Sequence, residues 1–370
     1  MDTVQKPRVA YLDAARALGV LLVVLNHAAN RVWDNYENVQ AEFFSLDLTE
    51  KLAKTIFTVS SHLGVPLFLM ITGALILSRR FDTREELLRF YRRNWLSLLI
   101  TSEIWLFLGF WFNVLLGPND LVLETESTAG VLRACLKTLL FVDQVRFSSM
   151  WYIPMIVSVY LMLPIFAHFL HHAAEPRVLL LPMLLLFHSA MAVPTLNAYR
   201  EIYKLDLWYN NFFYSNLFSM YLLYAIAGWW IAGGGLRRLS DRAVALCAAG
   251  SAALCFYAQF WCYARSLHLL GYDSPGILIC SVFLFELLRR ADATLQRGEA
   301  FFAPVSRASF AVYLVHIFFN LLLFWFCDLS GWSNYTKLLL YLLVPLAGSA
   351  LIIWPLSKIP FCRKYLFLIK

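Results

Sequence analysis

The sequence predicts an all-α fold, a polytopic membrane bundle of about ten transmembrane helices with both termini in the cytoplasm. Of the 370 residues, 60% are hydrophobic and only 15% are charged, whereas soluble domains contain about 25% charged residues. The apolar residues form runs of roughly 15–22 residues separated by short polar breaks, and about 20 such residues are enough to cross a bilayer. The lipid bilayer is therefore the expected surrounding of this chain.

Ten apolar segments are predicted to cross the membrane, and the eighth is short enough to be tilted or re-entrant. The sequence shows neither an internal repeat nor a separate soluble domain, so residues 1–370 are expected to form a single domain. In chain order the segments are residues 9–29, 56–77, 95–116, 150–167, 178–194, 213–234, 243–264, 274–288, 306–326 and 337–357.

The lysines and arginines determine the predicted orientation. With the N-terminus inside, twenty of the 31 basic residues fall on inner segments, ten fall on outer segments, and Arg16 stays within the membrane. This excess is the positive-inside pattern, so both termini are expected on the cytoplasmic side. The long segments 30–55 and 117–149 would then face outward. The net charge of +7 comes from the loop arginines, and nucleic acid is not an expected partner.

The seven cysteines predict neither a disulfide framework nor a metal site. Their number is odd, they lack the spacing of metal ligands, and most lie within apolar runs. A thiol in such a run packs as a small hydrophobic group. No metal is therefore expected.

The first predicted span, residues 9–29, carries three ionisable side chains, Asp13, Arg16 and His27. On a helix, Arg16 and His27 would face nearly the same way and lie about 16 Å apart along the axis. Asp13 precedes Arg16 by one turn on the same side. Ionisable residues at this depth usually mark a functional path, so the three are candidate catalytic residues. The alternative is an ion pair at the helix end together with a packing histidine.

The strongest cluster of charge is the inner segment 78–94, here called the basic segment, which directly follows the second predicted span. Guanidinium groups match phosphate oxygens in geometry and in charge, and Arg89 and Arg92 would project from one helical face. The segment is therefore a candidate phosphate-binding site, and the alternative is a positive-inside anchor on anionic lipid. Its arginines are Arg79, Arg80, Arg84, Arg89, Arg92 and Arg93.

Further residues in later spans have two interpretations each. Trp151 and Tyr152 open the fourth span, where aromatic residues often only mark the membrane interface. Glu286 in the eighth span is either a pathway residue or the partner of a nearby arginine. His316 in the ninth span is either a packing histidine bonded to a neighbour or a catalytic residue.

Five stretches, in order over nearly the whole chain, have the pattern of a known family. They are Y-L-D-x-x-R with R-x10-H in span one, G-V-P-L-F-L-M-I-T-G in span two, the basic R-x-x-R, M-W-Y-I-P in span four, and the late S-F-A-V-Y-L-V-H. On these stretches the chain resembles the acyltransferase-3 family of integral membrane acyltransferases, especially the stand-alone bacterial O-acetyltransferases of surface polysaccharides. Thr72 stands where the family usually has serine, and it keeps the hydroxyl group.

The resemblance implies a bacterial inner-membrane enzyme with acetyl-coenzyme A as donor. The implied acceptor is a sugar hydroxyl of a cell-surface polysaccharide or a polyprenyl-linked saccharide, and Arg16 and His27 are implied to be essential. Acyl transfer to a hydroxyl needs a base that titrates near neutrality. We therefore expect His27 to be that base or, as the alternative, to carry the acyl group, with Arg16 fixed by Asp13. The residues expected to bind the coenzyme are Arg80, Arg89, Arg92, Arg93, Trp151 and Tyr152.

The alternative function is a transporter or flippase, in which Arg16, His27 and Glu286 form a relay through the membrane. Inverted repeats would support this class of protein, and the sequence shows none. Neither interpretation predicts an oligomeric state.

Overall fold

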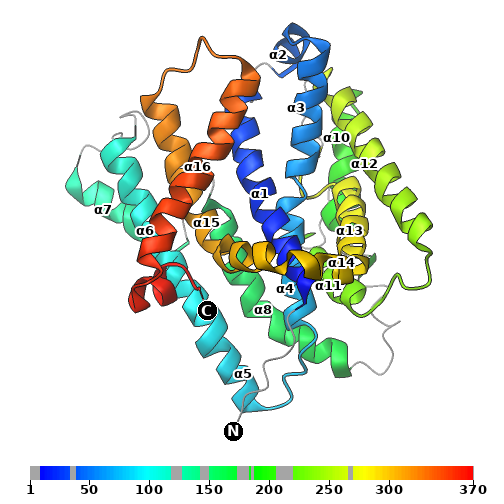
Figure 1. Ribbon diagram of the computed structural model, residues 1–370, viewed down its shortest axis with the longest axis vertical. Helices are drawn as coiled ribbons and strands as arrows, with labels where there is room; N and C mark the ends of the chain where they lie inside the picture. Colours follow the sequence, from blue (N-terminus) through cyan, green and yellow to red (C-terminus); the bar gives the residue numbers. More distant parts are fainter. Residues whose placement is uncertain are drawn as a thin grey trace. The chain divides into compact units, whose positions relative to one another are not determined.

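The computed structural model describes residues 9–33, 39–117, 127–141, 150–172, 183–184, 187–205, 220–265 and 270–369. Within these ranges the regular structure is helical and there is no strand (Figure 1). The predicted all-α fold is therefore confirmed.

Seven helical stretches in the described part of the chain are long and apolar enough to cross a membrane. They are Ala10–Trp33, Leu48–Ile76, Arg84–Leu116, Tyr152–His172, Asp241–Tyr263, Asp292–Phe326 and Asn334–Leu356. They match predicted spans one to four, seven, nine and ten. Of predicted span 178–194, residues 178–182 and 185–186 lie outside the described part of the chain, and residues 188–194 are helical. The sixth span is described only as α11 (Met220–Ala232), and the eighth is the 16-residue helix α13 (Pro275–Arg290). A polytopic helical protein is thus confirmed, and the count of ten stays a prediction.

The second span begins earlier than the predicted residue 56. Its helix α3 (Leu48–Ser61) is capped by the preceding Asp47, whose carboxylate accepts a hydrogen bond from the backbone N–H of Glu50 at 2.8 Å. Helix α4 (Gly64–Ile76) continues the span after a short turn. Lys54 is buried in α3 because it pairs with Glu42 at 3.1 Å. This partner lies in α2 (Val39–Ser45), which explains how the helix can extend through a charged stretch.

The helices form two compact units, in which α1 (Ala10–Trp33) and α15 (Glu299–Phe326) begin in unit 1 and end in unit 2. Unit 1 is drawn from the described residues within 1–26, 35–79 and 172–309, and unit 2 from those within 27–34, 80–171 and 310–370. Besides the helices named above, unit 1 contains η5 (His188–Ala192), α10 (Val193–Ile202), α12 (Asp241–Tyr263), α14 (Asp292–Leu295) and η7 (Gln296–Gly298). Unit 2 contains α5 (Arg84–Phe90), η1 (Tyr91–Trp95), α6 (Leu96–Leu116), α7 (Thr128–Leu139), α8 (Tyr152–His172, with the boundary in its last turn), α16 (Asn334–Leu356) and η8 (Cys362–Leu366).

Within unit 1, α4 and α11 pack side by side (Figure 1), and their backbones are in van der Waals contact. A Cβ atom on Gly73 would lie 1.7 Å from the carbonyl oxygen of Ala225, and one on Gly228 would lie 2.1 Å from that of Met70. Only glycine permits this approach, which is the usual way in which membrane helices pack closely. The glycine that ends the second-span motif therefore has a packing role.

Within unit 2, the π-helical turn η1 attaches the basic segment to α8. The hydroxyl of Tyr91 donates to the carbonyl oxygen of Leu161 at 3.0 Å, and the indole N–H of Trp95 donates to that of Val157 at 3.1 Å. The basic segment is thus held against α8 by two side-chain hydrogen bonds.

Candidate active site

The first half of α1 contains a buried polar cluster in unit 1. Asp13 is 4% exposed, and the hydroxyl of Ser306 donates to its Oδ1 at 2.5 Å. Nη1 of Arg16 lies 3.6 Å from the same oxygen and donates to the Ser306 hydroxyl at 3.4 Å. The predicted Asp13–Arg16 pair is present, and Ser306 of α15 completes it.

The two charged members of this cluster differ in their access. Asp13 is enclosed, whereas the Arg16 side chain is 28% exposed. A separation of 3.6 Å is longer than a charge-assisted hydrogen bond, which is about 2.7–2.9 Å. Asp13 and Ser306 therefore orient a guanidinium group that is still partly open to a ligand.

The second half of α1 carries His27, which lies beside a second histidine in unit 2. The ring centres of His27 and His316 are 5.2 Å apart, and the ring planes are inclined by 38°. His27 is half-buried, whereas His316 is 1% exposed. The structure thus brings together a predicted catalytic residue and a histidine for which the sequence left two interpretations open.

The hydrogen bonds of His316 define its tautomer. Its Nδ1 lies 2.6 Å from the carbonyl oxygen of Tyr313 and 3.1 Å from that of Val312. A carbonyl oxygen can only accept, so Nδ1 carries the proton, and in the neutral ring Nε2 is the acceptor. Nε2 is buried and has no hydrogen-bond partner among the described residues.

A further pair of polar side chains lies one turn beyond His27. Nε of Arg31 donates to Oδ1 of Asn320 at 2.9 Å, and the guanidinium carbon lies 4.2 Å from the ring centre of Phe324. Asn320 is 1% exposed, and its Nδ2 is buried without a recorded partner. Arg31 lies within segment 30–55, which was predicted to face outward. Its position four residues after His27, on the same helical face, was the signal that could have identified it.

Tyr152, predicted to bind the coenzyme, contacts the histidine region through Tyr313. The rings of Tyr152 and Tyr313 are 5.2 Å apart, and those of Tyr313 and His316 are 6.0 Å apart. Trp151 is half-buried, with its ring 6.2 Å from that of Tyr152. Within unit 2 the M-W-Y-I-P stretch therefore belongs with the His316 region.

The other predicted coenzyme residues are exposed arginines of unit 2. Arg80 precedes α5, Arg89 lies in it, and Arg92 and Arg93 lie in η1. Among the described residues of unit 2, no hydrogen bond or ion pair joins these arginines to either histidine of the pair. The structure thus gives two separate groups of predicted residues, an exposed basic segment and a buried histidine region.

Glu286 proves to be an arginine partner. It is fully buried in α13, where it accepts from Nε of Arg289 at 2.7 Å and from Nε of Arg290 at 2.6 Å. Arg290 also pairs with Asp241 at 2.5 Å. Two cations thus neutralise this carboxylate, which favours the structural interpretation over the relay.

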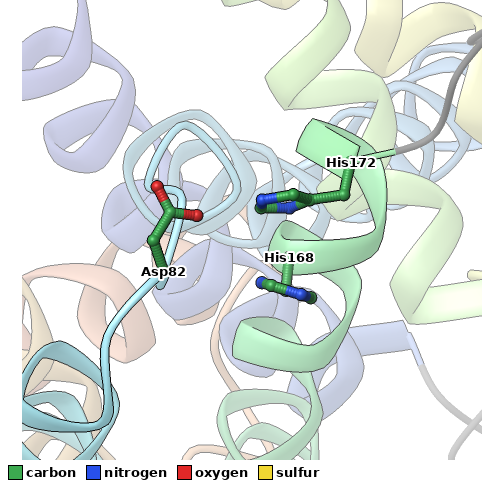
Figure 2. A group of neighbouring side chains, drawn as sticks. All are labelled: Asp82, His168 and His172. Atoms are coloured by element: carbon green, nitrogen blue, oxygen red, sulfur yellow. The ribbon is translucent and has the colours of Figure 1, made fainter.

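One group of described side chains has the composition of a metal site. Figure 2 shows His168 and His172, one turn apart on α8, beside Asp82 of the segment before α5. One ligand atom from each lies within 4.8 Å of the others, and all three residues are exposed. The expected absence of a metal stays a prediction.

Comparison with known proteins places the chain in a family. Neither a curated protein nor a solved structure matches the chain. The family described as "Acyltransferase domain" matches residues 9–354, a range that includes the Asp13–Arg16–Ser306 cluster, the histidine pair and the basic segment. The chain therefore belongs to the acyltransferase-3 family and is a membrane acyltransferase.

Proposed function

We propose that this membrane acyltransferase moves an acetyl group from cytosolic acetyl-coenzyme A to a hydroxyl group of a cell-surface polysaccharide or a polyprenyl-linked saccharide. The proposed location is the bacterial inner membrane. The observation that carries the proposal is the half-buried His27 beside His316, because an imidazole that a substrate can reach is the group that hydroxyl acylation needs.

His27 is the proposed general base. It removes the proton from the acceptor hydroxyl as the oxygen attacks the thioester carbonyl, and general-base help of this kind contributes about 10²–10⁴-fold in rate. Its partial exposure supports this role, since the hydroxyl must come within hydrogen-bond distance of the ring.

Arg16 is the proposed anchor for a polar group of the coenzyme. Asp13 and Ser306 restrict its orientation, and the accessible part of the guanidinium can donate to an oxygen of the ligand. Loss of Asp13 would leave Arg16 without its fixed orientation and would not affect the chemical step. Replacing Asp13 is therefore expected to lower the affinity for the donor more than it lowers kcat.

The coenzyme phosphates are proposed to bind Arg80, Arg89, Arg92 and Arg93, which are exposed on the side predicted to be cytoplasmic. Tyr152 contacts the ring of Tyr313 beside His316. We therefore assign Trp151 and Tyr152 to the acyl end of the donor, and the arginines to its phosphate end.

The transporter alternative is weaker because its relay needs a titrating Glu286. That carboxylate is held by hydrogen bonds from two arginines within α13, and its charge is already compensated. A carboxylate whose charge is compensated in this way does not pass protons readily.

The direct test is acetyl transfer by the purified full chain in lipid nanodiscs. Acetyl-coenzyme A carrying a labelled acetyl group is supplied with a bacterial surface glycan, and labelled ester and free thiol are measured. Equal amounts of ester and thiol are expected. A chain that binds the glycan yet leaves acetyl-coenzyme A intact would support the transporter alternative instead.

A further inference from the structure

His316 has an unusual state for a residue that only fills space. It is 1% exposed, and its Nδ1–H bonds to the carbonyl oxygen of Tyr313 at 2.6 Å, yet Nε2 is buried without a partner. Buried polar atoms are nearly always hydrogen-bonded, so an exception needs an explanation. The atom has lost its contact with water, and no structural contact in the described chain compensates for this loss.

We propose that His316 is a positioning residue for His27: its Nε2 accepts a hydrogen bond from an N–H of His27 and fixes the ring that acts on the acceptor hydroxyl. This inference rests on the proposed function, because it specifies how the base of that reaction is oriented. It concerns only atoms of α1 and α15 that lie within unit 2.

The separation of the two rings permits this bond. Their centres are 5.2 Å apart, and each nitrogen lies off the centre of its own ring. A rotation of His27 about its side-chain bonds can therefore bring one of its nitrogens within about 3 Å of Nε2, the usual hydrogen-bond distance. Catalytic hydrogen bonds are often long in the absence of substrate and shorten when it binds.

The tautomer of His316 determines the direction of the bond. Because Nδ1–H is donated to the backbone, neutral His316 has a lone pair and no proton at Nε2. It can accept from His27 but cannot donate to it. The N–H of His27 then points at His316, and its other nitrogen is left with the lone pair that a base requires.

The charges around the pair disfavour protonation of both rings at once. His27 faces His316 and also the Arg31 guanidinium, one turn away on α1. The ring of His316 also lies 6.0 Å from that of Tyr313, which in turn contacts Tyr152. Two imidazolium rings at 5.2 Å beside an arginine would repel one another strongly. While His27 carries the proton taken from the acceptor, His316 therefore stays neutral, and its Nε2 can accept a hydrogen bond from the imidazolium.

The reaction is balanced with His316 neutral throughout. The acceptor O–H bond breaks, its proton goes to the free nitrogen of His27, and the oxygen bonds to the thioester carbonyl carbon. The carbon–sulfur bond then breaks, and its electron pair goes to sulfur. The proton on His27 passes to that sulfur, which gives the ester and free coenzyme A.

The test compares two replacements that differ in one property. His316→Gln keeps a hydrogen-bond acceptor in the pocket, and His316→Leu removes it. Ser349→Ala is the matched control, because Ser349 of α16 is another buried polar residue of unit 2 whose hydroxyl has no recorded partner. For each full-length variant in nanodiscs, kcat, the KM for acetyl-coenzyme A and the temperature of thermal unfolding are measured.

We expect His316→Leu to lower kcat at least tenfold, with KM within about threefold of wild type, and His316→Gln to recover part of the loss. Hydrogen-bond partners of metal-bound histidines contribute about 10–100-fold, and we expect the same range for a partner that orients a general base. The control should match wild type. Unchanged kcat in His316→Leu would overturn the proposal. An equal loss of kcat in both variants, together with a lower unfolding temperature in both, would also overturn it, because a residue with only a packing role gives this result.

A second readout does not depend on the substrate. Diethyl pyrocarbonate modifies neutral imidazole, and the rate at His27 is followed by mass spectrometry of its peptide. A severalfold slower rate is expected in His316→Leu, with a smaller change in His316→Gln and none in the control. Equal rates in all four proteins would overturn the pairing. If wild type transfers no acetyl group, the proposed function fails, and this rate still decides whether the histidines are paired.

Discussion

At the residue scale, His27 has the most demanding task, because it must be reached by the acceptor while its ring is held in place. Its side chain is half-buried beside His316. We expect His27→Ala to lower the transfer rate by about 10²–10⁴-fold, the usual contribution of a general base, with donor affinity unchanged. Initial rates and coenzyme A binding are the measurements, and His188→Ala, an exposed histidine of η5, is the control. A loss of less than tenfold would make His27 a packing residue.

A second prediction at this scale concerns Arg92, one of the exposed arginines of the basic segment. If its guanidinium donates hydrogen bonds to a phosphate of the coenzyme, Arg92→Ala should weaken donor binding by about 1.5–3 kcal/mol, the contribution of a hydrogen bond to a charged group. Arg92→Lys should restore only part of the lost binding free energy, because a lysine cannot form the bidentate contact of a guanidinium group. Calorimetric titration with coenzyme A measures both.

Arg238→Ala removes an equally exposed arginine outside the basic segment, so it controls for the change in net charge. If the Arg92 variants bind coenzyme A as tightly as this control does, the basic segment is a lipid anchor.

Local geometry decided which site residues the sequence could predict. Asp13 and Arg16 are three positions apart on one helix, so their pairing follows from helical spacing alone. Ser306 is separated from Asp13 by 293 residues, and His316 joins His27 across a similar distance in the chain. Such partners depend on which helices pack together, and one sequence does not specify that choice.

At the scale of elements, the contact of α4 with α11 depends on two glycines. A Cβ atom on Gly73 would overlap the carbonyl oxygen of Ala225, so Gly73→Ala must separate the helices. We expect a loss of about 1–3 kcal/mol in unfolding free energy, the usual cost of overpacking, measured by thermal or denaturant unfolding in detergent.

Gly250 in α12 provides the matched replacement, because a Cβ atom there would meet nothing within 4 Å. Gly250→Ala should be neutral or stabilise by about 0.5–1 kcal/mol, since alanine favours a helix. A similar response of the two variants would mean that α4 and α11 are not packed as closely as the glycines indicate.

The boundaries of elements were predicted less well than their existence. The second span was predicted to begin at residue 56, after the charged residues Glu50, Lys51 and Lys54. The helix begins at Leu48, and Lys54 is buried against Glu42 and the ring of Tyr263. A charge with a partner can lie inside a helical bundle, and the partner comes from a different helix.

At the scale of the whole molecule, the orientation in the membrane rests on the excess of arginine and lysine on one set of segments. Single cysteines introduced within 78–94 should react with an impermeant reagent only after permeabilisation, in a chain whose natural cysteines are replaced. Cysteines within 117–130 should react in intact spheroplasts. The opposite pattern would reverse the orientation and move the donor site to the outer face.

The orientation makes the reaction directional, and this is the last prediction. Coenzyme A is cytosolic, and the arginines proposed to bind it are predicted to lie inside. His27 follows Arg16 by eleven residues on the continuous helix α1, about 16 Å further along the axis at ~1.5 Å per residue. The thioester would therefore enter from the cytoplasm along α1, and the acceptor would meet it from the opposite side.

Proteoliposomes of known orientation provide the measurement. Glycan acceptor is enclosed on one side, and acetyl-coenzyme A is supplied only at the face that bears the termini. Acetylated glycan should appear in the acceptor compartment while free coenzyme A stays with the donor, and the His27→Ala variant should yield neither above background. If ester forms only when both substrates share the donor compartment, the acetyl group does not cross the membrane, and the acceptor must approach His27 from the cytoplasmic side.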